Sequence, residues 1–236
     1  MKYSDFRQYI GTSKQELFRE TLVENRDAIR VKKETKVIQN LEKIFEATLK
    51  ISNEKGFQAM SMRDLSHETG LSTGALYAYF SGKDELLEML QRQSRHVVQK
   101  IFLDHIETEH DPVIKLRTAI RTHLYLSELM QPWFYFSYME TKNLSKAEKE
   151  KAIESELYTE NIFADILKIA QDKYFYAKRD YRLIAGVIKA MLQDWYLKRW
   201  KYAKRNVTVD QYADFVIEFV ETYCMFDSTK SQKRST

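Results

Sequence analysis

Histidine and carboxylate side chains, the usual metal ligands and proton carriers, gather at one place in the sequence. They are Asp104, His105, Glu107, Glu109, His110 and Asp111. The two histidines are five residues apart, whereas two histidines that bind one metal from the same helix face are four apart. We therefore interpret the group as a solvated charged turn before Pro112. No Ser-His-Asp arrangement, phosphate-binding loop or dinucleotide glycine pattern is recognisable, so we expect no enzyme, no catalytic or metal-binding residue and no cofactor.

A second group of side chains, between residues 61 and 83, suits hydrogen bonding to phosphates and close approach to base edges. It contains the small residues Thr73, Gly74, Ala75 and Ala78, the tyrosines Tyr77 and Tyr79, and Lys83. A glycine inside a helix costs up to about 1 kcal/mol relative to alanine. A position without a side chain would offset that cost by letting the backbone come close to DNA, while tyrosine hydroxyls can bond to phosphate oxygens.

Short helices must position these side chains, and nearby apolar and capping residues predict where those helices lie. Apolar residues from Val37 to Leu49 recur at three- and four-residue steps, which predicts a helix with one apolar face that Gly56 ends. Ser61 with Asp64 forms a capping-box pattern for a helix that runs to Gly70. Ser72 caps a helix over Thr73–Tyr79, and Ser81 caps a longer one with Asp84 and Glu85 in its first turn. Two short helices joined by a tight turn indicate a helix-turn-helix.

At these residues the sequence resembles the TetR/AcrR family of bacterial transcriptional regulators. The pattern runs from about Ile38 to Leu90, and its most specific part is STGALYAYFSGKDELL. The resemblance implies that the contacts to double-stranded DNA are made by Ser61, Arg63, Thr73, Gly74, Ala75, Tyr77, Tyr79 and Lys83. It also implies a core of Leu65, Leu71, Leu76 and Phe80. The family's usual alanine before the Gly-Leu turn is Thr69 here.

The resemblance further implies a helical body that dimerises through its last two long helices and encloses a ligand. We expect those helices over 182–204 and 209–226, the second capped by Thr208. The apolar faces of the predicted homodimer interface include Ile184, Val187, Met191, Phe215, Phe219 and Tyr223. Placing a charge on such a face would bury it without a partner.

Composition agrees with an all-α fold. The chain of 236 residues has only 6 Gly and 2 Pro, where average usage would give roughly 16 and 12. Cys224 is the single cysteine, which is typical of a buried thiol in a reducing compartment. The longest aromatic-rich uncharged run, Leu129 to Met139, is about half the length of a membrane span. We therefore expect a cytoplasmic protein with no membrane contact.

Six consecutive residues, Trp133 to Tyr138, are dense in aromatic side chains. They cannot all face one core, and buried tyrosine hydroxyls need partners. Two interpretations stay open, a wall of a ligand pocket or ordinary core and interface packing. The pocket interpretation assigns a small, largely apolar effector, with a fatty-acyl or aromatic part, to Trp133, Phe134, Tyr135, Phe136, Tyr138 and Trp195.

Basic residues cluster between Lys198 and Arg205, around Trp200 and Tyr202. They suit the C-terminus of a helix, whose dipole favours cations. Alternatively they capture an anionic ligand group such as the phosphates of an acyl-CoA. Residues 37–90, by contrast, hold five basic and eight acidic side chains, so bulk charge alone does not predict DNA binding in that region.

Four segments follow: an N-terminal extension over 1–34, partly helical with a helix over about 13–30; a helix-turn-helix domain over 35–90; a ligand-binding and dimerisation domain over 91–228; and a flexible tail over 229–236. We predict a ligand-responsive regulator, a repressor, that binds a palindromic operator as a dimer and is released by an apolar small molecule. The alternative is a helical ligand-binding or interaction protein whose helix-turn-helix no longer binds DNA specifically. The steep salt dependence of phosphate contacts would separate the two.

Overall fold

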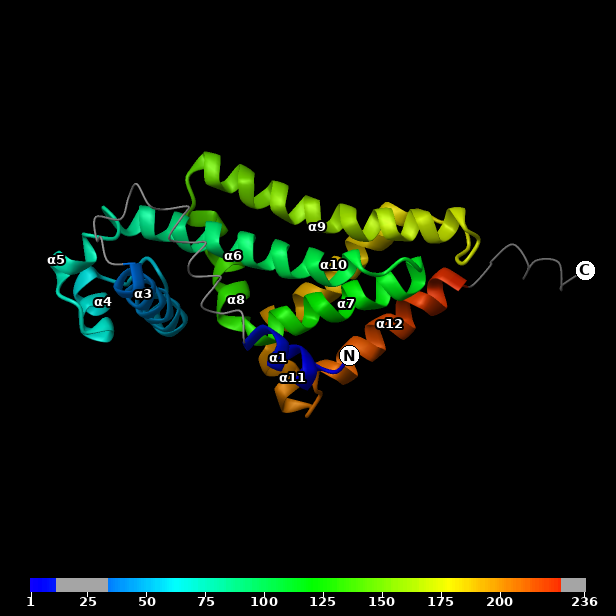
Figure 1. Ribbon diagram of the computed structural model, residues 1–236, viewed down its shortest axis with the longest axis horizontal. Coiled ribbons are helices and arrows are strands. Elements are labelled where there is room, and N and C mark those ends of the chain that lie inside the picture. The colour runs from blue at the N-terminus through cyan, green and yellow to red at the C-terminus, as the bar shows by residue number, and fades with distance from the viewer. Residues whose placement is uncertain (12–33, 226–236) are drawn as a thin grey trace, which may run out of the picture. The chain divides into compact units, whose positions relative to one another are not determined.

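The computed structural model describes residues 1–11 and 34–225. Within those ranges every regular element is a helix and there is no strand (Figure 1), which confirms the predicted all-α fold. The predicted helix over 13–30 and the predicted flexible tail over 229–236 lie outside the described residues.

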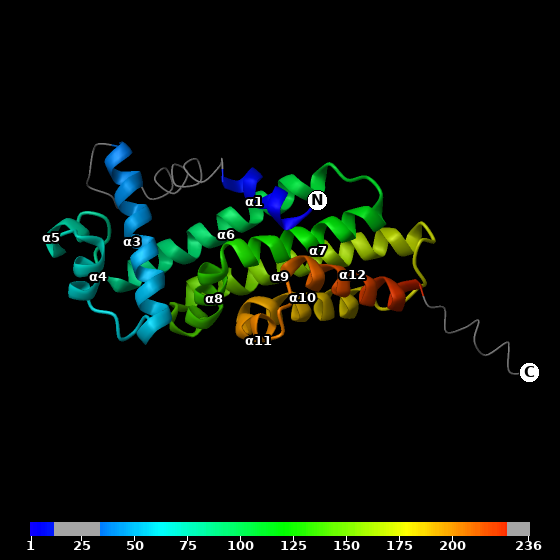
Figure 2. The ribbon, with the colours of Figure 1, turned by 90° about the horizontal axis from the view of Figure 1, so that it is seen from below.

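From α3 to α12 the helices follow one another with short connections (Figures 1 and 2). They are α1 (Tyr3–Gly11), α3 (Glu34–Lys55), α4 (Met62–Thr69), α5 (Thr73–Leu76), α6 (Lys83–Glu107), α7 (Pro112–Leu129), α8 (Gln131–Glu140), the 3₁₀ turn η1 (Thr141–Asn143), α9 (Lys146–Asp172), α10 (Tyr181–Leu197), α11 (Arg199–Lys204) and α12 (Val209–Met225). Pro112 opens α7 and Pro132 lies in the first turn of α8, as expected of a residue without a backbone N–H.

The capping signals around the helix-turn-helix are confirmed. Gly56 and Gly70 have φ of 86° and 69°, the left-handed conformation that glycine adopts at no steric cost after a helix. The Ser61 hydroxyl accepts from the Asp64 amide at 3.2 Å, and the Asp64 carboxylate accepts from the Ser61 amide at 2.8 Å. Ser72 caps α5 through the Ala75 amide at 3.1 Å. These bonds fix where α4 and α5 begin.

Two predicted helices differ from the structure. The helix expected over Thr73–Tyr79 ends at Leu76, and residues 77–79 form turns instead. The long helix expected over 182–204 is broken at Lys198, whose φ of −121° separates α10 from α11. Ser81 donates from both its amide and its hydroxyl to Glu85, at 2.5 and 2.7 Å, and α6 starts one residue later than the predicted cap implies.

The chain divides into two compact units. The head unit comprises Ser4–Val97 and Met130–Ile153, and the body unit comprises Met1–Tyr3, Val98–Leu129 and the chain from Glu154 onward, as far as these ranges are described. The head unit is therefore larger than the predicted segment 35–90, because α8, η1 and the start of α9 group with it. Helices α6 and α9 each contribute residues to both units.

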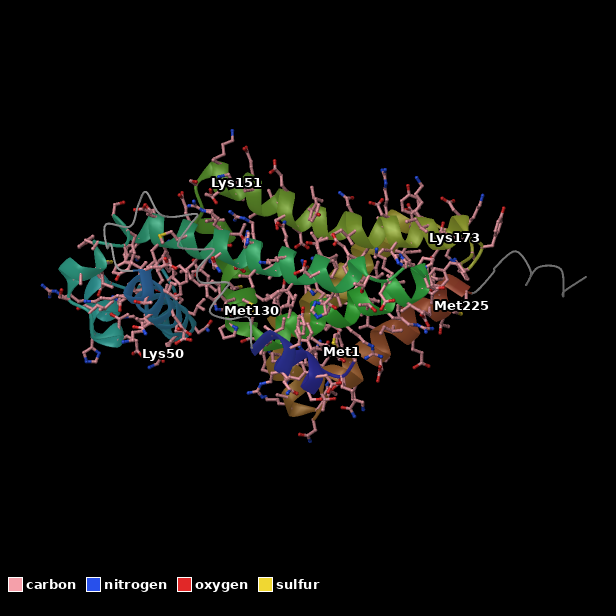
Figure 3. The ribbon with its side chains drawn as sticks, in the orientation of Figure 1. Met1, Lys50, Met130, Lys151, Lys173 and Met225 are labelled. Carbon is pink, nitrogen blue, oxygen red and sulfur yellow. The ribbon has the colours of Figure 1, made fainter. Side chains whose placement is uncertain are left out.

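The core of the head unit combines the helix-turn-helix with α8. Its buried residues come from α3 to α6, including Leu41, Phe45, Leu65 and Leu76, and from α8, which contributes Phe136. The predicted core residues Leu65, Leu76 and Phe80 are buried, and Leu71 packs against them partly buried. Figure 3 marks Met130, directly before α8, and Lys50, which lies on α3.

The body unit is a bundle in which α7 packs against both α10 and α12. Thr208 caps α12 by accepting from the Gln211 amide at 3.2 Å, as predicted. The start of the chain also docks here: the Tyr3 amide donates to Asp210 at 3.1 Å, and the Tyr125 hydroxyl donates to the same carboxylate at 2.5 Å. Among the described residues, no helix is long and apolar enough to cross a bilayer.

Candidate nucleic-acid interface

The start of α5 presents a small surface of low side-chain volume. Gly74 is exposed, Thr73 and Ala75 are half-buried, and the Tyr77 side chain that follows is exposed. A Cβ atom added at Gly74 would meet nothing within 4 Å, and its φ is not in the left-handed region. Neither internal packing nor backbone conformation therefore requires glycine at this position.

Tyr79 does not share that surface. Its side chain is 1% exposed, and its hydroxyl accepts from the Asn40 side-chain amide at 2.7 Å. The predicted hydrogen bond from the Tyr79 hydroxyl to a DNA phosphate does not fit this burial: Tyr79 belongs to the core of the head unit. Burial is favoured because Asn40 satisfies the hydroxyl that a buried tyrosine must pair.

Asn40 is the residue that sequence reasoning missed. It lies on the inner face of α3, three residues after Val37 and four before Ile44, and is buried with them. A polar residue within an apolar helical stripe was the signal available in the sequence, because a buried amide must find a hydrogen-bond partner.

Lys83 is held at the N-terminus of α6. Its ammonium group donates to the Gln58 carbonyl at 2.9 Å and lies 5.2 Å from the centroid of the Phe57 ring. An ammonium group has three hydrogens, so this bond leaves donor capacity for a phosphate.

The other cations of the helix-turn-helix are partly neutralised. Lys50 pairs with Glu68 and Lys55 with Asp64, each at 2.7 Å. The hydrogen bonds from Lys55 and Ser61 lower the pKa of Asp64, and the bond to Glu68 raises the pKa of Lys50. Arg63 is exposed on α4. Ser61 is exposed too, but its hydroxyl is engaged with Asp64 at 2.7 Å.

The aromatic residues of α8, for which a ligand pocket was one interpretation, have different surroundings in the structure. Trp133 meets Phe45 edge-on at 5.6 Å, and Phe136 meets Phe57 edge-on at 5.7 Å. Both are therefore part of the packing of the head unit. Phe134 and Tyr135 are half-buried, and Tyr138 is exposed. A ten-residue helix presents its side chains in all directions, which explains the different surroundings.

Trp195 is fully buried in an aromatic cluster of the body unit. Its ring lies 4.9 Å from that of Tyr202 and 5.0 Å from that of Tyr212, and its indole N–H donates to Glu128 at 3.1 Å. Packing of α10 to α12 therefore accounts for the burial of Trp195, and its predicted ligand contact stays a prediction.

The basic cluster beside Trp195 is largely paired within the chain. Arg199 donates two bonds to Glu128, at 2.7 and 3.0 Å. Lys198 and Lys201 both bind Asp194, as does the Tyr202 hydroxyl. Burial acts to raise the pKa of Asp194, but the three hydrogen bonds outweigh it and lower that pKa. Anion capture by this cluster would require those pairs to open.

A chain of polar side chains, buried at His123 and Lys189, links α7, α10 and α9 of the body unit. The Lys189 ammonium lies 3.4 Å from Nε2 of His123 and 3.3 Å from a carboxylate oxygen of Glu156. Burial, with the Lys189 charge as a lesser cause, lowers the pKa of His123 well below its usual value. Burial also lowers the pKa of Lys189. The arrangement ties three helices of the body together.

Most of the predicted dimer face is exposed. Val187 on α10 and Phe215, Phe219 and Tyr223 on α12 are large apolar side chains open to solvent, and the Phe215 and Phe219 rings stack at 6.3 Å. Ile184 is instead buried within the unit and Met191 is half-buried. Leu183, which sequence reasoning did not select, is exposed beside Ile184.

Comparison with known proteins agrees with this geometry. Residues 44–90 match the family model described as bacterial regulatory proteins, tetR family. The HTH-type transcriptional regulator PksA of Bacillus subtilis (strain 168) is 29% identical over 202 residues, which cover 81% of this chain and 93% of PksA.

Solved structures share the fold. A tetR-family regulatory protein from Rhodococcus RHA1 superposes with a TM-score of 0.71 at 16% identity, covering 80% of this chain and 98% of that one. AibR, solved with isovaleryl coenzyme A and operator DNA, gives 0.68 at 16% identity, with 76% and 97% covered. In residues 44–90 and in its all-helical fold, the chain is thus similar to bacterial transcriptional regulators of the TetR family.

Proposed function

We propose that the chain is a cytoplasmic repressor that binds a palindromic operator as a homodimer and is released by a largely apolar small molecule. In this proposal α5 enters the major groove, and Thr73, Gly74 and Ala75 face the base edges. Ser61, Arg63, Tyr77 and Lys83 contact the sugar-phosphate backbone.

The observation that carries the proposal is the open glycine at the start of α5. Gly74 is exposed, and the space beyond its Cα is empty within the chain. Since glycine destabilises a helix relative to alanine, its use here is best explained by an external surface that approaches the backbone closely. The adjacent exposed Tyr77 and the partly engaged Lys83 provide hydrogen-bond donors for phosphates.

Dimerisation is supported by the exposed apolar side chains of α10 and α12. Leu183, Val187, Phe215 and Phe219 are all at least partly open to solvent in the single chain. Large apolar side chains that gather on the surface mark interaction sites. A two-fold dimer would present two α5 helices to half-sites about one helical turn apart.

The effector part of the proposal is supported by the fold. AibR was solved with isovaleryl coenzyme A, and an acyl chain of this kind matches the apolar effector that we propose. Of the residues predicted to line the site, Phe134 and Tyr135 remain half-buried candidates.

Replacement of Gly74 by Ala tests the proposed interface. The added methyl group should stabilise the head by up to about 1 kcal/mol, since alanine is the better helix former, and should weaken operator binding by blocking backbone approach. Thermal unfolding and titration of an operator selected from random DNA by the wild-type protein measure the two effects. Gly186→Ala in α10 is the matched control, because its Cβ would make only an ordinary contact with Glu160 at 3.7 Å. A Gly74→Ala protein with wild-type affinity would contradict the assignment of α5.

A further inference from the structure

Phe57 lies between two groups of the head unit that are far apart in sequence. One is Phe136 of α8, whose ring meets that of Phe57 at 5.7 Å with an interplanar angle of 77°. The other is the ammonium of Lys83, which lies over the Phe57 ring at 5.2 Å. Phe57 and Phe136 are 1% and 2% exposed. A ring packed in this way has little freedom to rotate.

The Lys83 ammonium is held from two directions by one short loop. The Phe57 ring attracts it through its negative face, and the neighbouring Gln58 carbonyl accepts a hydrogen bond from it at 2.9 Å. A lysine side chain otherwise loses substantial rotamer entropy when it is fixed on a ligand. The loop therefore places the ammonium before any ligand arrives.

We propose that Phe57 and Phe136 are positioning residues for Lys83, so that α8 sets the strength of a backbone contact to DNA. The proposal rests on the proposed function, in which Lys83 binds phosphate. It adds that a helix outside the matched region 44–90 controls this contact. Without the Phe136 ring, Phe57 can turn, and the ammonium loses the surface that holds it.

Trp133 provides the comparison that separates positioning from simple packing. It lies on the same helix and packs edge-on against another phenylalanine of the same core, Phe45, at 5.6 Å. The Lys83 ammonium lies over the Phe57 ring and donates to the Gln58 carbonyl, so Trp133 packs against a different ring from the one that holds Lys83. Loss of either aromatic residue should destabilise the head, but only loss of Phe136 should alter the Lys83 contact.

The test is a double-mutant cycle on DNA affinity. Phe136→Leu, Trp133→Leu and Lys83→Gln are made singly, and each leucine variant is combined with Lys83→Gln. Binding is measured over a series of salt concentrations, well below the unfolding temperature, on an operator selected by the wild-type protein. Because each lost phosphate contact reduces the slope of log affinity against log salt by about 0.9, Phe136→Leu should reduce that slope by about 1 per head. It should add nothing further to Lys83→Gln.

Trp133→Leu should lower the unfolding temperature, keep the wild-type salt slope and act additively with Lys83→Gln. An unchanged slope in Phe136→Leu, or additivity between Phe136→Leu and Lys83→Gln, would overturn the positioning role. If Phe136→Leu does not fold, Phe136→Met and Phe57→Leu enter the same cycle with the same expectation. If the wild-type protein selects no DNA, the proposed function fails, and this result is distinct from additivity in the cycle.

Discussion

His123 shows how the setting of one residue determines its chemistry. Its ring is buried on α7 with the Lys189 ammonium at 3.4 Å. Both the loss of water and the neighbouring cation disfavour the imidazolium, so the pKa of His123 is lowered. The folded protein therefore binds fewer protons than the unfolded chain just below the ordinary histidine pKa of about 6.5.

This difference predicts a loss of stability in mild acid. The contribution of His123 is fully present above about pH 6.5, and it falls by up to about 1.4 kcal/mol per pH unit below that value, until the folded pKa is reached. His123→Gln should remove this part of the pH dependence. Urea unfolding between pH 5 and 7.5 measures it, with His67→Gln, an exposed position on α4, as the control. Equal pH dependence in wild type and His123→Gln would show that His123 is protonated without cost.

Single residues also set the limit of what the sequence predicts. The capping serines Ser61 and Ser72 were predictable because each binds an amide three residues ahead. The placement of Tyr79 was not, since it depends on Asn40, which is 39 residues away. The DNA-contact pattern places both tyrosines, Tyr77 and Tyr79, in one functional set, and only the packing separates them.

At the scale of whole helices, α8 and α10 also depend on contacts that the sequence does not reveal. The aromatic composition of α8 left open a ligand-pocket wall or core packing, because contacts such as Phe57–Phe136 join distant parts of the chain. No glycine or proline lies at Lys198 to predict the break between α10 and α11. At that point Lys198 and Lys201 converge on Asp194, and the Tyr202 hydroxyl joins them. A local sequence pattern does not predict side-chain contacts of this kind.

Helix α12 carries the sharpest prediction about assembly. Phe219 is 53% exposed in the single chain, so Phe219→Glu should leave the monomer folded. In a dimer the same carboxylate would be buried without a partner, at a cost of several kcal/mol. Sedimentation at micromolar concentration should therefore show a dimer for the wild type and a monomer with an unchanged helical spectrum for Phe219→Glu.

Ile114→Glu is the control for this experiment, since Ile114 is an exposed apolar residue of α7 outside the predicted face. It should remain a dimer. A wild-type protein that sediments as a monomer, or a dimer that survives Phe219→Glu, would place the interface elsewhere.

At the scale of the whole molecule, the proposed release from the operator by an effector requires the two ligands to weaken each other's binding. A ligand that releases the protein from DNA binds the DNA-free form more tightly, and operator DNA must weaken its binding by the same factor. With isovaleryl coenzyme A as the probe, we expect tryptophan fluorescence to report binding and operator to reduce its affinity by about 5- to 150-fold. Equal affinity for free and operator-bound protein would exclude this compound as the inducer. Native mass spectrometry would then identify any molecule retained during purification.

The number of phosphate contacts gives a second prediction at this scale. If Arg63 and Lys83 are the charged phosphate contacts of each head, a dimer makes four such contacts, and log affinity should fall against log salt with a slope of about −3.6. A much steeper slope would assign cations of the N-terminal extension over 1–34 to DNA. Titration of the selected operator between about 50 and 200 mM salt measures the slope.

The pairing of Lys50 with Glu68 and of Lys55 with Asp64 then has a consequence for the cell. Bacteria under osmotic stress accumulate ions, and a repressor that relied on ten phosphate contacts would lose about 500-fold in affinity when salt doubles. With four contacts the slope is about −3.6, and the loss is only about 12-fold. If the chain is a repressor, as proposed, the pairing of these lysines would let it stay on its operator when the ionic strength changes, so that release would depend mainly on the effector.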